Sequence, residues 1–481
     1  MENLKIYALT DSHQETRNLS TLFSYIYQKE QNNNNKFLIL DSGDIFKGIY
    51  KKDLSVNAYI KLKELLPHSE IFITLGNNDF GFCRADFNYL LDTVEKFKNI
   101  GINVICANLV NKSGFAEFVD RYKILDFNDE KILITGFCVN NSCVKKFGYE
   151  LLSQIEAYRQ LLNDINEPLD KVFVLNHNWL GPSVEFCDEI KKDNKLQNIS
   201  LIIGGHEHSR KEPDFERNIY YPMSFARSIY DITFNNNNIK ADEIMLNDIK
   251  IEPIFEKPII EYELETELYK PIIKRVLNLT KKYSDPCPLG TFISDYMKKF
   301  GNTDIAFHST GFTMNQLSTN DSDCITKYDF EKVICAATTI EKVDLTTMQI
   351  KSIFEHALRN RICKDKGNAQ FLQCSNNIKI VGTYREDKTY KIMQIYINNN
   401  ALLDENCLPI DNHKTFSCTI DSYIGTGEQG FSMLKDLEKE IIFYSNEELK
   451  INKVLYLGLL EAENLHKNTT NYKCFEIIDL E

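Results

Sequence analysis

The segment KFLILDSGD, residues 36–44, runs from an apolar stretch directly into two aspartates separated by a serine and a glycine. A short apolar run bounded by turn residues is typical of a buried β-strand. Asp41 and Asp44 therefore stand at the carboxyl end of that strand, where open α/β sheets place their functional sites. Gly43 beside them allows the backbone to approach a ligand closely.

The same arrangement recurs at four other apolar runs. Run 4–9 leads into Asp11-Ser12-His13, run 70–75 into Gly76-Asn77-Asn78-Asp79, run 171–175 into Asn176-His177, and run 199–203 into Gly204-Gly205-His206-Glu207-His208. A single DxH or strand-end carboxylate is usually a helix cap or a solvated group. Five strand ends in order, all carrying metal-ligand side chains, indicate one shared site. The candidate ligands are Asp11, His13, Asp44, Asn77, His177, His206 and His208.

These residue types suit a pair of divalent ions. Mixed carboxylate, imidazole and amide ligands favour Mn, Fe, Zn or Co over a thiolate site. Two ions a few Å apart need a bridging carboxylate, and Asp44 is the natural bridge. Asp11, His13 and His208 would complete one ion, and Asn77, His177 and His206 the other. Such a pair can clamp a phosphoryl oxygen and generate hydroxide for in-line attack.

The chain of 481 residues is too long for one core and divides into two predicted domains. Apolar runs, including those at 103–109 and 131–137, alternate with amphipathic stretches at 53–66, 84–99 and 149–166. This alternation predicts an α/β metal-binding domain over residues 1–254. A linker at 255–285, with a helix at about 262–283, precedes a second mixed α/β domain at 286–481. Helices are predicted there at 289–299 and 346–358.

The composition limits the kinds of ligand and partner that the protein is expected to bind. The net charge of −13, without a long basic run, argues against polymeric DNA or RNA. A small anion is still acceptable, because bound ions reverse the local field. The thirteen cysteines form no CxxC pair and favour reduced, buried thiols. No apolar run reaches about 18 residues, and Met1 to Leu9 lacks a signal-peptide pattern. We therefore expect a cytoplasmic protein without a membrane segment, of undetermined oligomeric state.

The motifs DxH, GD, GN-x-(D/E), an isolated H and GGHxH, in this order, resemble the calcineurin-like metallophosphoesterases. The two-domain layout resembles their 5′-nucleotidase and UDP-sugar hydrolase branch. Residues 289–295, 304–311 and 422–431 resemble that branch's NLGNLIxDA, DIAxxNGG and FLAxGGDGF segments. The resemblance implies a four-layer α/β/β/α sandwich followed by a 5′-nucleotidase C-terminal-like domain. It also assigns Ser309, Gly311 and Phe431 to substrate binding.

The sequence departs from the family at the catalytic histidine. The family's GNHEFD is here Gly76-Asn77-Asn78-Asp79-Phe80-Gly81, so Asn78 replaces the histidine that assists the leaving group, and Gly81 replaces its aspartate partner. Asparagine can hydrogen-bond a phosphoryl oxygen but cannot donate a proton in catalysis. Asn78 and Asp79 are the candidate catalytic residues, with Asp79 either a substitute acid or a structural member of the motif.

Substrate-gripping positions differ as well. Asp285 and Met314 stand where the family has arginines, and Ala336 stands where it has a second aromatic ring. We therefore expect a metal-dependent phosphohydrolase acting on a small phosphate ester, a nucleotide-like molecule or a pyrophosphate. The alternative is a metal-binding pseudo-enzyme or interaction protein that lacks the catalytic acid. A nuclease of the same superfamily is disfavoured by the charge and by the second domain.

Overall fold

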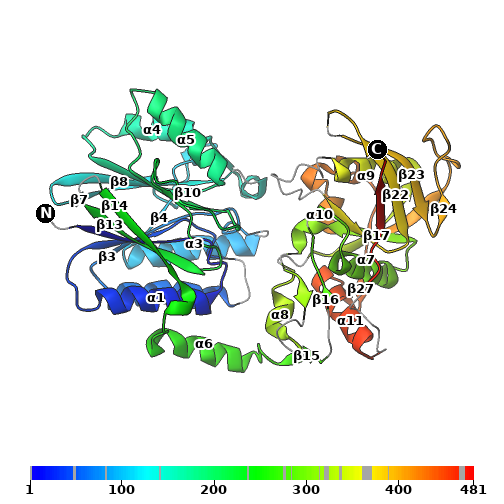
Figure 1. Ribbon diagram of the computed structural model, residues 1–481, viewed down its shortest axis with the longest axis horizontal. Helices are drawn as coiled ribbons and strands as arrows, with labels where there is room; N and C mark the ends of the chain where they lie inside the picture. The colour runs from blue at the N-terminus through cyan, green and yellow to red at the C-terminus, as the bar shows by residue number, and fades with distance from the viewer. Residues whose placement is uncertain are drawn as a thin grey trace. The chain divides into compact units, whose positions relative to one another are not determined.

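The chain forms two compact units, Met1–Glu265 and Thr266–Glu481 (Figure 1). The computed structural model describes residues 3–46, 50–81, 84–139, 142–235, 238–274, 278–282, 284–313, 315–318, 324–334, 338–359, 371–387, 389–464 and 472–480.

The first unit contains a six-stranded sheet in the order β14-β13-β1-β2-β3-β4. Strands β1 to β4 pair in parallel, and β13 and β14 add an antiparallel edge. The strands are β1 (Leu4–Leu9), β2 (Phe37–Asp41), β3 (Ser69–Thr74), β4 (Ile102–Ile105), β13 (Ser228–Asn235) and β14 (Asn238–Met245). Because parallel strands point the same way, the loops after β1, β2 and β3 meet at one edge.

A second sheet in this unit has the order β12-β11-β10-β8-β7. Its strands are β7 (Tyr122–Phe127), β8 (Glu130–Cys138), β10 (Lys171–His177), β11 (Leu201–Gly205) and β12 (Ile219–Tyr220), and a small sheet joins β5 (Leu109–Asn111), β6 (Gly114–Phe115) and β9 (Tyr149–Leu151). Strands β8, β10, β11 and β12 are parallel, so the loops after β10 and β11 also share an edge.

The two sheets pack face to face, with helices on their outer faces (Figure 1). Buried side chains such as Ile6, Ile134 and Leu175 fill the space between the sheets. The helices are α1 (Thr16–Glu30), α2 (Lys52–Leu65) and α3 (Arg84–Asn99) on the first sheet, and α4 (Gln154–Asp164) and α5 (Leu180–Lys192) on the second. This order confirms the predicted four-layer α/β/β/α sandwich.

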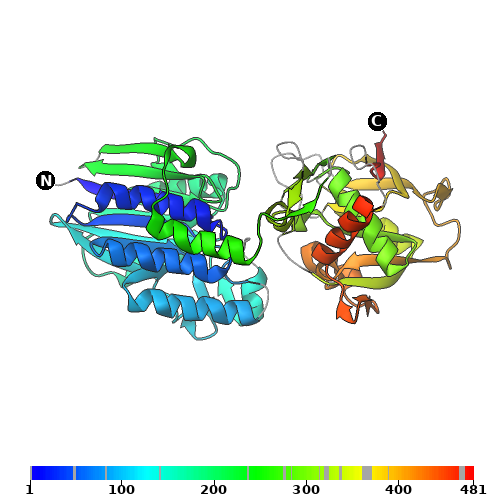
Figure 2. The same cartoon turned by 90° about the horizontal axis from the view of Figure 1, so that it is seen from below.

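The helix predicted at about 262–283 is wrong in its position. The structure has α6 at Pro253–Glu265, beside α1 (Figure 2), followed by strands β15 (Pro271–Ile273) and β16 (Asn278–Leu279). Proline suits the first turn of a helix, which favours a start at Pro253, whereas Pro271 restrains the residue before it from helical geometry. The predicted linker at 255–285 thus contains most of α6 and both strands.

The helix predicted at 149–166 is shorter than expected. Residues 149–151 form β9, and α4 begins only at Gln154. The Ser153 hydroxyl accepts a hydrogen bond from the Glu156 N–H at 3.3 Å and caps the helix there. A serine cap satisfies one of the free N–H groups of the first turn, which fixes the start of the helix.

The second unit is also mixed α/β. Its larger sheets have the orders β21-β17-β25-β20-β26 and β24-β23-β22-β29. The strands are β17 (Ile305–Ser309), β20 (Ile340–Thr346), β21 (Leu372–Cys374), β22 (Ile378–Tyr384), β23 (Tyr390–Ile397), β24 (Asn400–Ala401), β25 (Thr415–Asp421), β26 (Glu440–Ile441) and β29 (Glu476–Asp479). Shorter elements are β18 (Leu317–Ser318), β19 (Ile325–Thr326), β27 (Phe443–Tyr444), β28 (Glu447–Glu448), α8 (Lys327–Glu331) and α10 (Ser422–Gly425).

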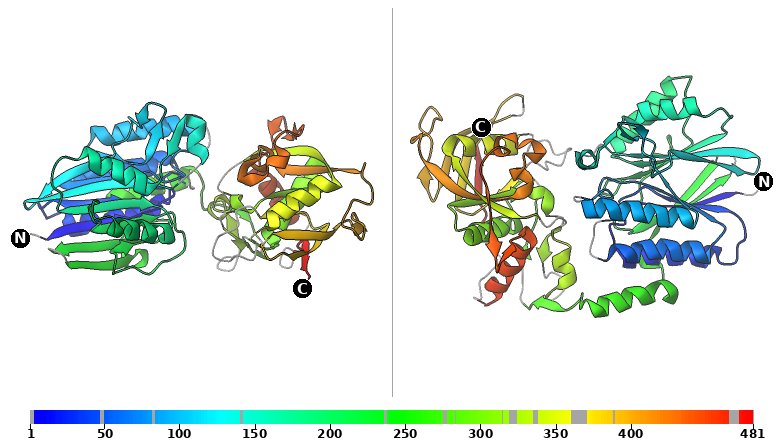
Figure 3. Two further views of the ribbon diagram at one scale, coloured as in Figure 1. Left: turned by 90° about the horizontal axis from the view of Figure 1, so that it is seen from above. Right: turned by 180° about the vertical axis from the view of Figure 1, so that it is seen from behind.

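Two cores lie on opposite faces of β17. Ile305 and Phe307 face a core that includes α9 (Thr347–Leu358, yellow in the left view of Figure 3), and Ala306 between them faces a core with α7 (Pro288–Gly301) and α11 (Ile451–Asn464). This alternation is the two-residue period of a strand. Helices α7 and α9 confirm the helices predicted at 289–299 and 346–358.

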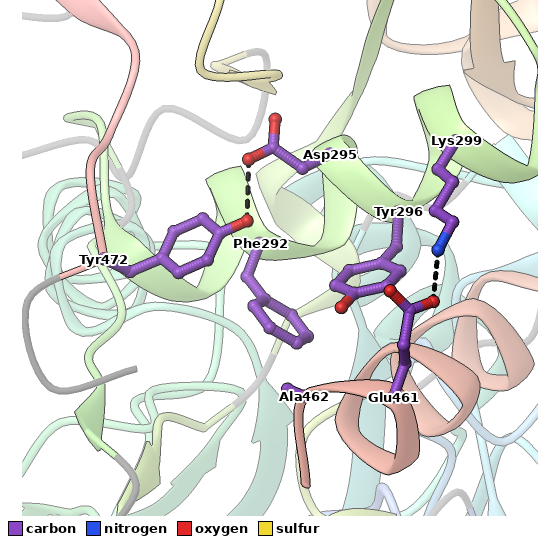
Figure 4. A pocket seen from close by; sticks show the side chains of 7 residues that line it. All are labelled: Phe292, Asp295, Tyr296, Lys299, Glu461, Ala462 and Tyr472. Atoms are coloured by element: carbon purple, nitrogen blue, oxygen red, sulfur yellow. Dashed lines mark hydrogen bonds and ion pairs between the residues drawn. The ribbon is translucent and has the colours of Figure 1, made fainter. Parts of the chain in front are cut away.

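A pocket of about 150 Å³ in the second unit lies beside α7 and α11 (Figure 4). Rings of Phe292, Tyr296 and Tyr472 line it, and Lys299 and Glu461 form an ion pair there. The Tyr472 hydroxyl donates a hydrogen bond of 2.7 Å to the Asp295 carboxylate. The Lys299–Glu461 ion pair links α7 to α11, and the Tyr472–Asp295 hydrogen bond links α7 to the segment that precedes β29.

Among the residues that the structure describes, seven cysteines are buried thiols outside any disulfide: Cys106, Cys138, Cys187, Cys287, Cys374, Cys407 and Cys418. None of the described helices combines the length and the apolar composition that a bilayer crossing requires.

Candidate metal centre

The loops after five strands bring the predicted ligands of the first unit together. One group comprises Asp11, His13, Asp44 and His208, and the other comprises Asp44, His177 and His206. Within each group, one donor atom of every residue lies within 4.8 Å of the others. Asp44 belongs to both groups, which is the arrangement that a bridging carboxylate requires.

The first group contains ring nitrogens and carboxylate oxygens that face one another. The Nε2 atoms of His13 and His208 are 3.0 Å apart. Asp11 Oδ1 lies 3.6 Å from His13 Nε2 and 3.5 Å from His208 Nε2, and Asp44 Oδ2 lies 3.6 Å from His13 Nε2. Asp11 Oδ1 is buried and has no hydrogen-bond partner among the described residues. A buried carboxylate oxygen without a partner is costly, so a cation is its natural companion.

The second group is oriented by a backbone carbonyl. His177 Nδ1 lies 2.6 Å from the carbonyl oxygen of Ser42, which can only accept, so Nδ1 donates. His177 Nε2 then faces Asp44 Oδ2 at 3.3 Å and Asn77 Oδ1 at 3.1 Å. Fixing one ring nitrogen through a carbonyl, so that the other faces the ligand, is how metal-binding histidines are commonly positioned. The ring of His206 lies 5.2 Å from that of His177.

Four candidate ligands have left-handed backbone conformations. The φ angles of Asp11, His13, Asp44 and His206 are 47°, 46°, 57° and 71°. Such conformations cost about 1–3 kcal/mol each and persist where the surroundings impose them. Asp11 N–H donates to Gly43 O (2.8 Å), His13 N–H to Asp44 O (3.0 Å), and His206 N–H to Asp11 Oδ2 (2.9 Å). The loops therefore hold one another in the strained form.

Two glycines allow this close packing. Gly43 has a φ of +88°, and a Cβ there would lie 2.5 Å from the backbone nitrogen of Gly76. A Cβ on Gly76 would lie 2.2 Å from Asp44 Oδ1. Both positions thus require glycine, in agreement with the expected close approach of the backbone.

Asp79 anchors the loops rather than facing the donor cluster. Its carboxylate accepts hydrogen bonds from the backbone N–H groups of Asp44 (2.9 Å), Ile45 (2.9 Å), Phe46 (3.0 Å) and Gly76 (2.8 Å). Burial and the neighbouring Asp44 carboxylate raise the pKa of Asp79 to about 7. These contacts favour the structural role over the role of substitute acid, which stays a prediction.

Asn78 contacts the shared carboxylate directly. Its backbone N–H donates to Asp44 Oδ1 at 2.7 Å, and its side-chain Nδ2 donates to Asp44 Oδ2 at 2.5 Å. The amide that replaces the family's histidine therefore lies at the edge of the donor cluster. It offers hydrogen-bond donors there but no titratable proton.

The buried charges of the cluster shift one another's pKa. Burial acts to raise the pKa of Asp44, but His177 and His13 hold it below its ordinary value. Burial acts to lower the pKa of His177, but Asp44 and Asp11 outweigh this and raise it to about 10. Burial and the positive charge of His177 lower the pKa of His206 to about 4. The buried carboxylates of Asp11 and Asp44 thus require positive charge beside them.

The predicted substrate residues of the second unit lie in two adjoining loops. The Ser309 hydroxyl donates to Gln429 Oε1 at 2.9 Å and accepts from the Gly311 N–H at 3.2 Å. Phe431 is fully buried in the core, with its ring 4.7 Å from that of His356. As placed, Phe431 has no exposed face on which a base could stack, and its role in substrate binding stays a prediction.

The positions at which the sequence departs from the family's substrate residues are only partly described. The backbone carbonyl of Asp285 accepts a hydrogen bond from the Gln373 side chain. Met314 and Ala336 lie outside the described residues.

Sequence reasoning missed the groups that support the ligands. The Ser42 carbonyl carries no sequence signal, because every residue has one. Thr10 donates to Asp11 Oδ2 at 2.7 Å, and Tyr59 donates to the buried Asp41, whose other oxygen accepts from the Gly43 N–H. Thr10 immediately precedes Asp11, the first residue of the DxH motif. Its position next to a predicted ligand is a sequence signal that could have suggested its supporting role.

Comparison with known proteins agrees with this architecture. Residues 4–210 match the calcineurin-like phosphoesterase family, and residues 265–436 match the 5′-nucleotidase C-terminal domain. The chain is 21% identical to the trifunctional nucleotide phosphoesterase protein YfkN of Bacillus subtilis over 95% of its own length, but spans only 34% of that protein. It is 21% identical to the snake venom 5′-nucleotidase of Crotalus adamanteus, with 83% of this chain and 74% of the relative covered.

Solved structures share the fold of the whole chain. The 5′-nucleotidase precursor from Thermus thermophilus superposes with a TM-score of 0.74 at 15% identity over 100% of both chains. The 5′-nucleotidase from Candida albicans gives 0.68 at 12% identity over 95% of this chain and 98% of the other. With both parts matched in the expected order, the chain belongs to the calcineurin-like phosphoesterases that carry a 5′-nucleotidase C-terminal domain, a family of phosphoesterase and nucleotidase hydrolases.

Proposed function

We propose that this chain is a metal-dependent phosphohydrolase that uses two divalent ions on a small phosphate ester, a nucleotide-like molecule or a pyrophosphate. The observation that carries the proposal is the position of Asp44, which is buried and shared by both donor groups. The family membership supports the reaction class, and the donor cluster supports the dependence on metal.

The residues fit a pair of ions. Asp11, His13 and His208 would hold one ion, Asn77, His177 and His206 the other, and Asp44 both. Asp11 Oδ1 has no hydrogen-bond partner among the described residues, and the ring nitrogens of His13 and His208 face each other and this oxygen. A cation would relieve this arrangement. Oxygen and nitrogen donors without thiolate suit Mn, Fe, Zn or Co. When bound, two such ions polarise a phosphoryl oxygen and lower the pKa of a water molecule.

The protein's own groups would orient the substrate. The Ser42 carbonyl keeps His177 Nε2 directed at the cluster, and Asp79 keeps the loops of Asp44 and Gly76 together. We propose that the Asn78 amide, which already donates to Asp44 Oδ2, also donates a hydrogen bond to a phosphoryl oxygen of the substrate. Because it gives no proton, we propose that the preferred leaving groups depart as stable anions, such as a phenolate or a phosphate.

One observation favours the alternative of a metal-binding pseudo-enzyme. Asn78 donates hydrogen bonds to Asp44 from both its backbone N–H and its side-chain amide. The residue at the family's catalytic position therefore supports the candidate ligand Asp44 in this structure. A protein that kept the ions for stability alone would bind them and turn nothing over.

Turnover of activated esters separates the two readings. With Mn²⁺ added, the chain should hydrolyse p-nitrophenyl phosphate or bis(p-nitrophenyl) phosphate, because the p-nitrophenolate leaving group needs no acid. Removal of the metal with a chelator should abolish the reaction, and renewed Mn²⁺ should restore it. Absence of turnover on both esters, in protein that has bound its ions, would favour the pseudo-enzyme.

A further inference from the structure

Trp179 is the single tryptophan of the chain, and its side chain lies beside the candidate metal centre. It follows His177 by two residues and immediately precedes α5. The indole ring lies 4.2 Å from the ring of His206, at an interplanar angle of 80°. It nevertheless remains 48% exposed, which is unusual for so large an apolar ring.

Backbone hydrogen bonds hold this residue in place. The Trp179 carbonyl accepts from the backbone N–H of Ser183 at 3.1 Å and from its hydroxyl at 3.0 Å. The Trp179 N–H donates to Asn178 Oδ1 at 2.9 Å, and the Asn178 carbonyl accepts from the buried Tyr221 hydroxyl at 2.8 Å. These bonds fix the backbone of Trp179 at the start of α5, beside the ring of His206. An exposed tryptophan on an ordered backbone has only two side-chain torsions to fix, so it can contact a ligand at low entropic cost.

We propose that Trp179 is a substrate-contact residue that packs against the leaving group of a phosphoryl compound held at His206. The inference rests on the function proposed above. Because the indole offers a flat apolar surface next to His206, it favours phosphate esters whose leaving group carries a flat aromatic ring near the phosphorus. Contacts between aromatic rings add binding beyond the burial of area alone.

The sole indole also supplies the probe. In this 481-residue chain, tryptophan fluorescence reports on position 179 only, so Mn²⁺ bound at His206 should quench it. Calorimetric titration of the Mn²⁺-loaded protein should show tighter binding of phenylphosphonate than of methylphosphonate. Trp179→Leu should weaken phenylphosphonate binding by about tenfold and leave methylphosphonate binding within about twofold, as expected from the loss of one aromatic stacking contact.

Two further variants complete the test. Trp179→Phe should retain most of the preference for phenylphosphonate, because it keeps an aromatic ring. Phe215→Ala removes another exposed ring of the first unit, 70% exposed, and should change neither affinity. An equal loss for both phosphonates in Trp179→Leu, or no loss for either, would overturn the proposed contact while leaving the metal site standing. Absence of both Mn²⁺ quenching and phosphonate binding in the unmodified protein would instead refute the proposed function, and this inference with it.

Discussion

Replacing Asp44 by asparagine should weaken binding of both metal ions together and lower turnover of activated esters by about 10²–10⁴-fold. Asparagine keeps the shape of the side chain but removes the negative charge that both donor groups share. Removing one partner of a buried charge interaction costs about 3–5 kcal/mol, which corresponds to that range. Metal content and turnover of p-nitrophenyl phosphate, measured on the same preparation, check the prediction.

Asp11→Asn is the matched comparison, because Asp11 belongs to the first donor group only. It should weaken binding of one ion and leave most of the binding of the other ion intact. Asp126→Asn, at an 81% exposed side chain on β7, should change neither metal content nor turnover. If Asp44→Asn lost only one ion, Asp44 would not be the bridge, and the division of ligands between the two ions would have to be redrawn.

Turnover should also fall steeply as the pKa of the leaving group rises. Loss of general acid catalysis costs about 10²–10⁴-fold, and the cost falls on leaving groups that need a proton. Aryl phosphates and pyrophosphate bonds should therefore be cleaved far faster than AMP, whose ribose alkoxide is a poor leaving group. The check is a series of substituted phenyl phosphates together with AMP on the unmodified protein.

An AMP rate equal to that of activated esters would show that another residue supplies the proton. Asp79 would then be the first residue to examine, despite its four backbone contacts.

Asn78→His should selectively raise cleavage of poor leaving groups. Gly81→Asp, which would restore the family's aspartate beside this histidine, would strain the backbone and cannot simply be combined with Asn78→His. Gly81 has a φ of +68°, and a Cβ there would lie 2.1 Å from Cβ of Asp86. The leaving-group series on the unmodified protein therefore carries the test.

The buried strands and the meeting of the candidate ligands followed from the sequence because both depend on simple periodicity. Buried strands such as 37–41 and 171–177 read as apolar runs, and their carboxyl ends meet wherever the strands are parallel. The sequence alone therefore groups the donors Asp44 and His177. The helices 288–301 and 347–358 followed for the same reason, from apolar residues at helical spacing.

The rest depends on contacts that leave no local pattern. The strained φ angles of Asp11 and His206 exist because distant loops hold them, and the Ser42 carbonyl that orients His177 is common to every residue type. Phe431 is equally compatible with a stacking ring and with a core residue, because both need an aromatic side chain. Its burial depends on α9 and the neighbouring loops of the second unit. Tertiary packing decides such positions, and periodicity does not encode it.

If two ions share Asp44, the metal content of the protein must reflect it. Chelator-treated protein should be reconstituted with excess Mn²⁺, freed of unbound metal, and analysed for manganese and protein together. We expect close to two Mn²⁺ per chain. One ion or none per chain at saturating metal would contradict the dinuclear centre.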